Sequence, residues 1–208
     1  MKIFKSIYAI LLVITSINTF AEDEKNFYAG LGYGYVNNRD ICSSSMYCKA
    51  NETAWVGDIF VGYQPIHYLA FEFAYLDLGH YSGVATKQSL AGGIAIDLDN
   101  KVQALELSAV ALLPITDAID VYARFGKARV SFDMGPSRAW FISGGPTFHV
   151  REQLEYNTTT VWGVGTQYQV TDCIDGRIEY REYSEVGTKN TLSEYKIDLY
   201  ALAATYHF

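Results

Sequence analysis

The sequence predicts an all-β fold: an eight-stranded antiparallel transmembrane β-barrel with short periplasmic turns and long extracellular loops. The composition is the first indication, because aromatic residues make up 15%, glycine is frequent (17) and proline is rare (4). The second is that no stretch after residue 21 is apolar for the length of a helical membrane span. The third is a period-two alternation that recurs eight times. Transmembrane barrels carry their hydrophobicity in such alternating strands, so the pattern favours a barrel.

Each alternating segment has one apolar or aromatic face and one face of small or charged residues. In residues 27–36, aromatic and aliphatic residues alternate with three glycines. In residues 68–78, Glu72 alternates with aromatic residues, so it is expected to point away from lipid. A soluble β-sandwich would instead have a polar outer face and an apolar inner face. The predicted strands are residues 27–36, 55–64, 68–78, 102–113, 119–131, 160–170, 176–183 and 196–208.

The predicted connections alternate between short and long, as they do in outer-membrane barrels. Short periplasmic turns are expected near Pro65, Pro114 and Cys173. The long polar segments, expected to form extracellular loops, are residues 37–53, 80–101, 133–159 and 184–193.

The first 21 residues have the features of a secretory signal peptide. Lys2 and Lys5 give a basic start, residues 7–14 are apolar, and small residues precede an expected cleavage after Ala21. An uncleaved membrane anchor is the alternative, although the apolar run is short for a spanning helix. We therefore predict a signal peptide at residues 1–21 and one barrel domain at residues 22–208. The formal net charge of −7 disfavours nucleic acid as a partner.

Three cysteines are present. Cys42 and Cys48 enclose a short polar stretch, and an exported chain meets an oxidising compartment, so a small loop disulfide is predicted. Two free thiols are the alternative. Cys173 has no obvious partner in the sequence.

Several segments resemble one family of outer-membrane proteins. FYAGLGYGYV resembles the first strand of the outer-membrane protein A family, GYQPIHYLAFEFAYLDLG its second hairpin, LLPITDAIDVYARFG its central turn and fifth strand, and GRIEYREY its seventh strand. The terminal YHF resembles the aromatic signature read by the barrel-assembly machinery, with Tyr206 and Phe208 as the expected assembly signal. Many relatives carry a periplasmic peptidoglycan-binding domain after the barrel. Because the sequence ends at Phe208, that domain is expected to be missing.

The resemblance implies a location and surroundings for the chain. It implies a monomer in the outer membrane of a Gram-negative bacterium, surrounded by outer-membrane lipid and lipopolysaccharide. The expected function is a structural, surface-presenting barrel. A small porin-like pore and an adhesin acting through its extracellular loops are the alternatives.

The lumen of an eight-stranded barrel is narrow enough for side chains to fill it. Charges that point inward must therefore be paired or solvated. The resemblance implies that Glu72 and Arg177 form a gate across the lumen. The Lys and Glu that offer alternative partners in the family correspond here to Val110 and Gln167, so the switch is expected to be incomplete. The predicted inward charges are Asp58, Glu72, Glu106, Arg124, Arg177, Glu179 and Arg181.

Two further features bear on function. Trp140, Phe141, Ile142 and Phe148 are apolar residues in a predicted loop. They could contact a host surface, a phage or a partner protein, or they could belong to strands that extend beyond the membrane or to the lipid interface. No catalytic, metal-binding or cofactor-binding pattern stands out, since no His-x-Ser arrangement lies on a predicted strand. We therefore predict neither an enzyme nor a cofactor.

Overall fold

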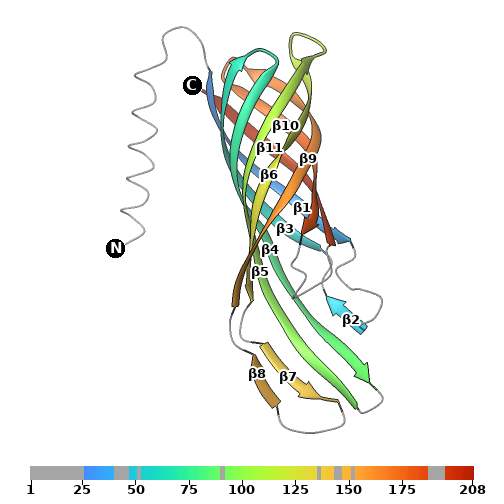
Figure 1. Ribbon diagram of the computed structural model, residues 1–208. Coiled ribbons are helices and arrows are strands. Elements are labelled where there is room, and N and C mark those ends of the chain that lie inside the picture. Colours follow the sequence, from blue (N-terminus) through green and yellow to red (C-terminus); the bar gives the residue numbers. More distant parts are fainter. Residues whose placement is uncertain are drawn as a thin grey trace, which may run out of the picture.

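A computed structural model describes most of the chain (Figure 1). The described residues form strands, turns and bends. None of them forms a helix with the length and apolar character needed to cross a membrane. The described ranges are residues 26–39, 47–50, 53–89, 92–134, 137–142, 147–150, 153–186 and 195–208.

Eight antiparallel strands close into a barrel, which confirms the predicted fold class (Figure 1). Their order around the ring is β4-β3-β1-β11-β10-β9-β6-β5, and the pairing of β5 with β4 closes it. All eight predicted segments lie within these strands, except for the end residues Tyr68 and Phe208. The strands are β1 (Phe27–Arg39), β3 (Thr53–Ile66), β4 (Leu69–Ser89), β5 (Gly92–Pro114), β6 (Ile119–Met134), β9 (Gln153–Thr171), β10 (Ile174–Val186) and β11 (Tyr195–His207).

The predicted alternation sets which side chains face lipid. Leu31, Ile59, Leu107 and Phe125 are exposed apolar residues on the outer wall, as a barrel surrounded by lipid requires. Their sequence neighbours are buried in the lumen or are small. The functional question therefore concerns the inner wall and the two ends of the barrel.

The short turns lie at one end of the barrel, where the C-terminus also lies (Figure 1). In outer-membrane barrels this end faces the periplasm. The β3–β4 turn consists of His67 and Tyr68, so Pro65 belongs to β3 rather than to the turn that was predicted around it. In the β9–β10 turn, the hydroxyl of Thr171 accepts hydrogen bonds from the backbone N–H groups of Cys173 and Ile174. Such a side-chain bond satisfies backbone groups that the ladder leaves unpaired.

The predicted loops at the other end contain strands, so the prediction of loops there was wrong in extent. β4 continues to Ser89 and β5 begins at Gly92, and the two remain paired from Gly79–Val102 to Ser89–Gly92. Three short strands extend this hairpin into a sheet beyond the barrel (Figure 1). They are β2 (Tyr47–Ala50) on β4, β7 (Ser137–Phe141) on β5, and β8 (Thr147–Val150) on β7.

A bulge marks the point where β4 leaves the barrel. The register of β4 against β5 shifts between Asp77 and Gly79, and Gly79 has a φ of 97°. Only glycine adopts this left-handed conformation without a steric cost. The backbone N–H of Gly79 also donates to a carboxylate oxygen of Asp77 at 3.3 Å. Such a bulge bends a strand, and here it separates the barrel from its extracellular extension.

Candidate functional site

The candidate site is the lumen, where seven buried charged side chains meet. Asp58, Glu72, Glu106, Glu179 and their partners come from β3, β4, β5, β6 and β10. None of these charged side chains is more than 3% exposed. We call the following seven residues the ion-pair cluster: Asp58, Glu72, Glu106, Arg124, Arg177, Glu179 and Arg181.

Glu72 lies between two arginines. Its Oε1 is 2.6 Å from Nη1 of Arg177, and its Oε2 is 2.7 Å from Nη2 of Arg124. Arg124 also reaches Glu106 at 3.0 Å and Glu179 at 3.0 Å. The Glu72–Arg177 pair implied by the resemblance is therefore present, but it is one contact in a larger network in which Arg124 bridges three carboxylates.

Arg181 forms the other half of the cluster. Its Nη2 lies 2.6 Å from Oδ2 of Asp58 and also contacts Glu179, while its Nη1 lies 3.5 Å from Oε2 of Glu106. Three arginines thus face four carboxylates in a space closed to solvent. Removing an arginine would leave buried carboxylate charge without compensation, and breaking a buried pair in this way typically costs about 3–5 kcal/mol.

Tyrosine and serine hydroxyls complete the hydrogen bonding of the carboxylates. Tyr28 donates to Glu72 at 2.7 Å, Tyr122 to Glu179 at 2.9 Å, and Tyr183 to Glu106 at 2.7 Å. Ser108 donates to Glu106 at 3.0 Å. The sequence pattern predicts an inward position for each of these tyrosines, although it does not predict which carboxylate each one meets.

Three aromatic rings surround the guanidinium of Arg177. Its Cζ lies 5.0 Å from the ring centroid of Tyr28, 5.3 Å from that of Phe60 and 5.5 Å from that of Tyr122. These distances lie within the range of cation–π attraction, which is stronger away from water. We call Tyr28, Phe60 and Tyr122 the aromatic collar.

Each ring of the aromatic collar lies over a glycine of a neighbouring strand. A Cβ atom added to Gly62 would lie 2.1 Å from the ring of Tyr28, and one added to Gly30 would lie 2.1 Å from the ring of Phe60. At Gly165 the added atom would lie 2.5 Å from the ring of Tyr122. The inward glycines therefore provide the space in which the three rings lie flat against the wall and reach Arg177.

The positions that correspond to the family's alternative partners carry no charge. Gln167 accepts a hydrogen bond from Nε of Arg177 at 2.8 Å and donates one to Asp175 at 2.8 Å. Asp175 in turn lies 2.6 Å from Nε2 of His207, at the periplasmic end of the barrel. Val110 is buried in the wall of β5. Besides Glu72, Arg177 therefore contacts the uncharged amide of Gln167 where the family has a Glu.

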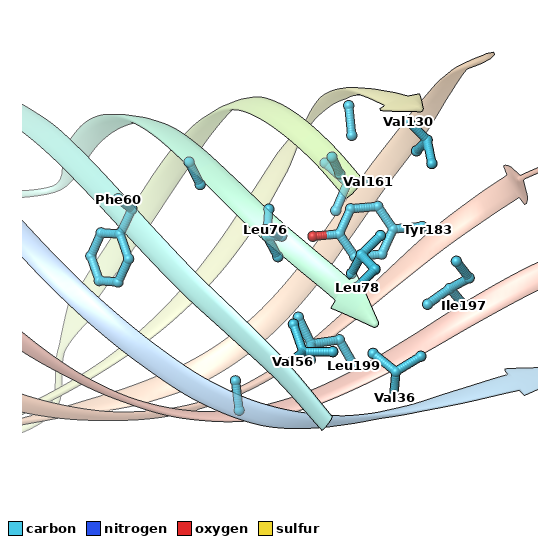
Figure 2. Packing of buried hydrophobic residues seen from close by; sticks show 14 of the residues in the cluster. Val36, Val56, Phe60, Leu76, Leu78, Val130, Val161, Tyr183, Ile197 and Leu199 are labelled. Carbon is cyan, nitrogen blue, oxygen red and sulfur yellow. The ribbon is translucent and has the colours of Figure 1, made fainter. Parts of the chain in front are cut away.

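An apolar layer lies on the extracellular side of the ion-pair cluster. Figure 2 shows these residues gathered inside the barrel, with Phe60 of the aromatic collar at the other end of the group. The sequence does not predict this layer, because most of its residues lie near the ends of the predicted strands, where alternation does not show that they meet inside the barrel. Its members are each at most 1% exposed. They are Val36, Val56, Leu76, Leu78, Val130, Val161, Ile197 and Leu199.

The remaining predicted residues lie away from the lumen. Trp140 and Phe141 are in β7 and Phe148 is in β8, so they belong to strands of the extracellular sheet. Tyr206 is exposed near the end of β11, with its ring 5.3 Å from that of Phe208.

One cysteine of the predicted disulfide, and all of the predicted signal peptide, lie outside the described residues. Cys42 and residues 1–25 lie outside the described residues, while Cys48 is in β2. The disulfide and the signal peptide therefore stay predictions. Within the described ranges, no group of three or more His, Cys, Asp or Glu is arranged to hold a metal ion.

Comparison with known proteins identifies the family. The sequence model of the OmpA-like transmembrane domain matches residues 22–208. This chain belongs to that family. Outer membrane protein A of Shigella flexneri is 26% identical over 210 aligned positions, which cover 98% of this chain and 56% of that protein. The protein of the same name from Klebsiella pneumoniae is 32% identical over 133 positions, or 64% of this chain and 35% of that protein.

The chain spans about half the length of the curated relatives it matches. As a member of the OmpA-like transmembrane domain family, it is a protein of the Gram-negative outer membrane.

Solved structures share the fold. Neisserial surface protein A superposes with a TM-score of 0.55 at 18% identity, over 88% of this chain and 97% of that one. The outer membrane protein OprG of Pseudomonas aeruginosa gives a TM-score of 0.57 at 10% identity, over 88% and 96%. At these identities the similarity concerns the barrel alone.

Proposed function

We propose that this barrel is a structural component of the outer membrane that holds its lumen closed and presents an extracellular sheet. The observation that supports a closed lumen most directly is the stacking of two different barriers. The ion-pair cluster fills the middle of the lumen, and the apolar layer lies beyond it on the extracellular side. An ion would have to break buried salt bridges and then cross a dry apolar region.

In this proposal the Glu72–Arg177 pair does not open as a gate but stays in place as a permanent contact across the lumen. Arg177 is held by Glu72, by Gln167 and by the three rings of the aromatic collar. No charged side chain stands at Val110 or Gln167 to receive either partner when the pair opens. Opening the pair would leave Arg177 buried without a carboxylate partner, because Glu72 would keep Arg124 while Gln167 offers Arg177 only an amide, and an uncompensated buried charge is strongly unfavourable.

The extracellular sheet supports a second role in surface recognition. Phe141 and Phe148 are 37% and 52% exposed, and their rings meet edge to face at 5.9 Å. Large exposed aromatic side chains on a surface sheet are typical of contact sites. The ligand would be a host, phage or neighbouring bacterial surface, as an adhesin requires.

The export and assembly of the chain are also part of the proposal. Residues 1–21 act as a cleaved signal peptide, residues 22–208 form the barrel domain, and Tyr206 and Phe208 are the signal for the barrel-assembly machinery. The assembled protein is a monomer surrounded by phospholipid and lipopolysaccharide.

Single-channel recording in a planar bilayer tests the closed lumen. We expect the refolded barrel to give no discrete conductance steps, while a porin inserted in the same bilayer provides the positive control. Insertion is verified separately by the shift in gel mobility between heated and unheated samples. Discrete steps in the native protein that change in an Arg177→Glu variant would contradict the proposal and make the lumen a pore constricted at Glu72–Arg177.

A further inference from the structure

The outer face of β6 changes character along its length. Val121, Ala123 and Phe125 are exposed and apolar, and the next two outward positions are Lys127 and Arg129, which are also exposed. β6 begins at the periplasmic turn with Ile119. At a rise of about 3.3 Å per residue and a tilt of about 40°, the two cations lie roughly 20–25 Å above that turn. This is the upper limit of an apolar band about 25 Å tall. Lys127 and Arg129 thus lie at the level of the lipid headgroups of the outer leaflet.

Lys127 and Arg129, which we call the basic pair, have no carboxylate partner among the described residues. Nζ of Lys127 donates to the hydroxyl of Thr160 at 2.7 Å, and Cζ of Arg129 lies 4.6 Å from the ring centroid of Tyr156. Each side chain is therefore oriented by a neutral neighbour, while its positive charge is not neutralised.

Two other outward cations near this end of the barrel, unlike the basic pair, have carboxylate partners. Lys101 lies 3.5 Å from a carboxylate oxygen of Asp77, and Lys196 lies 3.2 Å from one of Glu182. Among the side chains that the structure describes, positive charge without a carboxylate partner on this part of the outer wall is thus concentrated at the basic pair. Since the whole chain carries a net charge of −7, attraction of an anion to this wall has to be local.

The strands beside β6 give the basic pair an amphiphilic setting. The register places Leu107 opposite Lys127 and Leu105 opposite Arg129 on the β5 side, and both leucines are exposed. On the β9 side, Thr160 and Thr158 are the opposite residues. A ligand at this place would meet aliphatic surface on one flank and hydroxyl groups on the other, with two cations between them.

We propose that the basic pair binds a phosphate group on the headgroup of a multi-acyl glycolipid in the outer leaflet, the chemical class to which lipopolysaccharide belongs. Two residues along a strand are about 7 Å apart, so an ammonium and a guanidinium can approach one tetrahedral phosphate from two sides. Charge-assisted bonds from both cations, with Thr158 and Thr160 within reach, suit an anion with three or more acceptor oxygens. The acyl chains would then lie along Leu105 and Leu107. This inference rests on the proposed function only in that the barrel must stand in the outer membrane.

A lipid-binding titration tests the proposal. The refolded protein in phosphatidylcholine nanodiscs is supplied with increasing fractions of bisphosphorylated lipid A, and the bound lipid is counted by native mass spectrometry. We expect the Lys127→Gln/Arg129→Gln variant to bind lipid A about tenfold more weakly than the native protein. The matched Lys101→Gln/Lys196→Gln variant removes the same charge from paired cations and is expected to bind like the native protein.

Two further arms separate the sources of binding. Dephosphorylated lipid A should bind the native protein as weakly as lipid A binds the variant, and phosphatidylglycerol should also bind weakly. Equal binding by native protein and variant, an equal loss in the matched control, or equal binding of phosphatidylglycerol would each overturn the site. Gel mobility and circular dichroism verify that both variants fold, and the conductance of the same samples reports on the lumen independently.

Discussion

At the scale of single residues, the packing of the lumen depends on its glycines as much as on its charged side chains. The three rings of the aromatic collar reach Arg177 because Gly30, Gly62 and Gly165 leave room for them on the wall. Tyr28 is only 2% exposed and holds both a hydrogen bond to Glu72 and a cation–π contact with Arg177. It therefore cannot move without disturbing the ion-pair cluster.

A Gly62→Ala substitution tests this dependence. The new methyl group would lie 2.1 Å from a ring carbon of Tyr28, so the ring must move away from Glu72. We expect a loss of about 1–3 kcal/mol in the free energy of unfolding, as is usual for overpacking. Urea unfolding of the barrel in lipid vesicles, followed by tryptophan fluorescence, measures it.

Gly57→Ala is the matched control on the same strand. A Cβ atom at Gly57 would have no neighbour within 4 Å, so its free energy of unfolding should stay within about 0.5 kcal/mol of the native value. Equal losses in the two variants would show that the effect comes from the loss of a glycine and not from the displacement of Tyr28.

The sequence predicts the inward charges because alternation fixes the face of each residue. It does not predict which charges meet. Arg124 contacts Glu72 of β4, Glu106 of β5 and Glu179 of β10, and this choice depends on the tilt and stagger of the closed barrel. The sequence also does not predict that Tyr28, Tyr122 and Tyr183 bind the carboxylates of the ion-pair cluster. A tyrosine in a barrel strand is usually assigned to the lipid interface.

At the scale of elements, the period-two signal ends where lipid ends. Inside the membrane one face of a strand must be apolar, so the strands could be located from the sequence. Beyond Gly79, β4 and β5 have no lipid on one side and need no alternation. The sequence therefore predicts a loop at residues 80–101, although residues 80–89 of β4 are paired with residues 92–101 of β5.

Excising the tip of this hairpin tests whether the barrel folds independently of its extension. Gly83 of β4 is the register partner of Leu98 of β5, so replacing residues 84–97 by Asn-Gly keeps the register and supplies a two-residue hairpin turn. The excision removes most of the β4 partners of β2 and all of the β5 partners of β7, while the pairing of β7 with β8 is untouched. We expect the shortened protein to fold, because all contacts of the ion-pair cluster and the apolar layer remain.

The measurement is the heat-dependent shift in gel mobility, together with far-ultraviolet circular dichroism in detergent micelles. The native shift and a strand spectrum are expected in the shortened protein. Failure to fold would mean that the extracellular sheet is part of the folding unit, and any loss of binding on its removal could then not be assigned to Phe141 and Phe148.

At the scale of the whole molecule, the barrel is closed by the pairing of its last strand, β11, with its first, β1. β11 pairs with β1 from Tyr28–His207 to Arg39–Lys196, and the backbone N–H of Phe208 donates to the carbonyl oxygen of Phe27 at 3.0 Å. The first and last residues of the barrel thus meet at its periplasmic end. Phe208 contributes a backbone bond to this seam, while its ring packs only against Tyr206 among the aromatic residues described.

A Phe208→Ala substitution separates assembly in the cell from stability of the finished barrel. The backbone bond to Phe27 is kept, and the ring lost is partly exposed, so refolding into lipid vesicles and the free energy of unfolding should change little, by about 1 kcal/mol or less. In cells we expect the amount of barrel in the outer membrane to fall several-fold, because the terminal residue of the proposed assembly signal is gone. Tyr168→Ala, which removes an exposed aromatic ring from β9 instead, should leave that amount unchanged. Equal levels of the Phe208→Ala and Tyr168→Ala proteins in isolated outer membranes would exclude Phe208 as the signal.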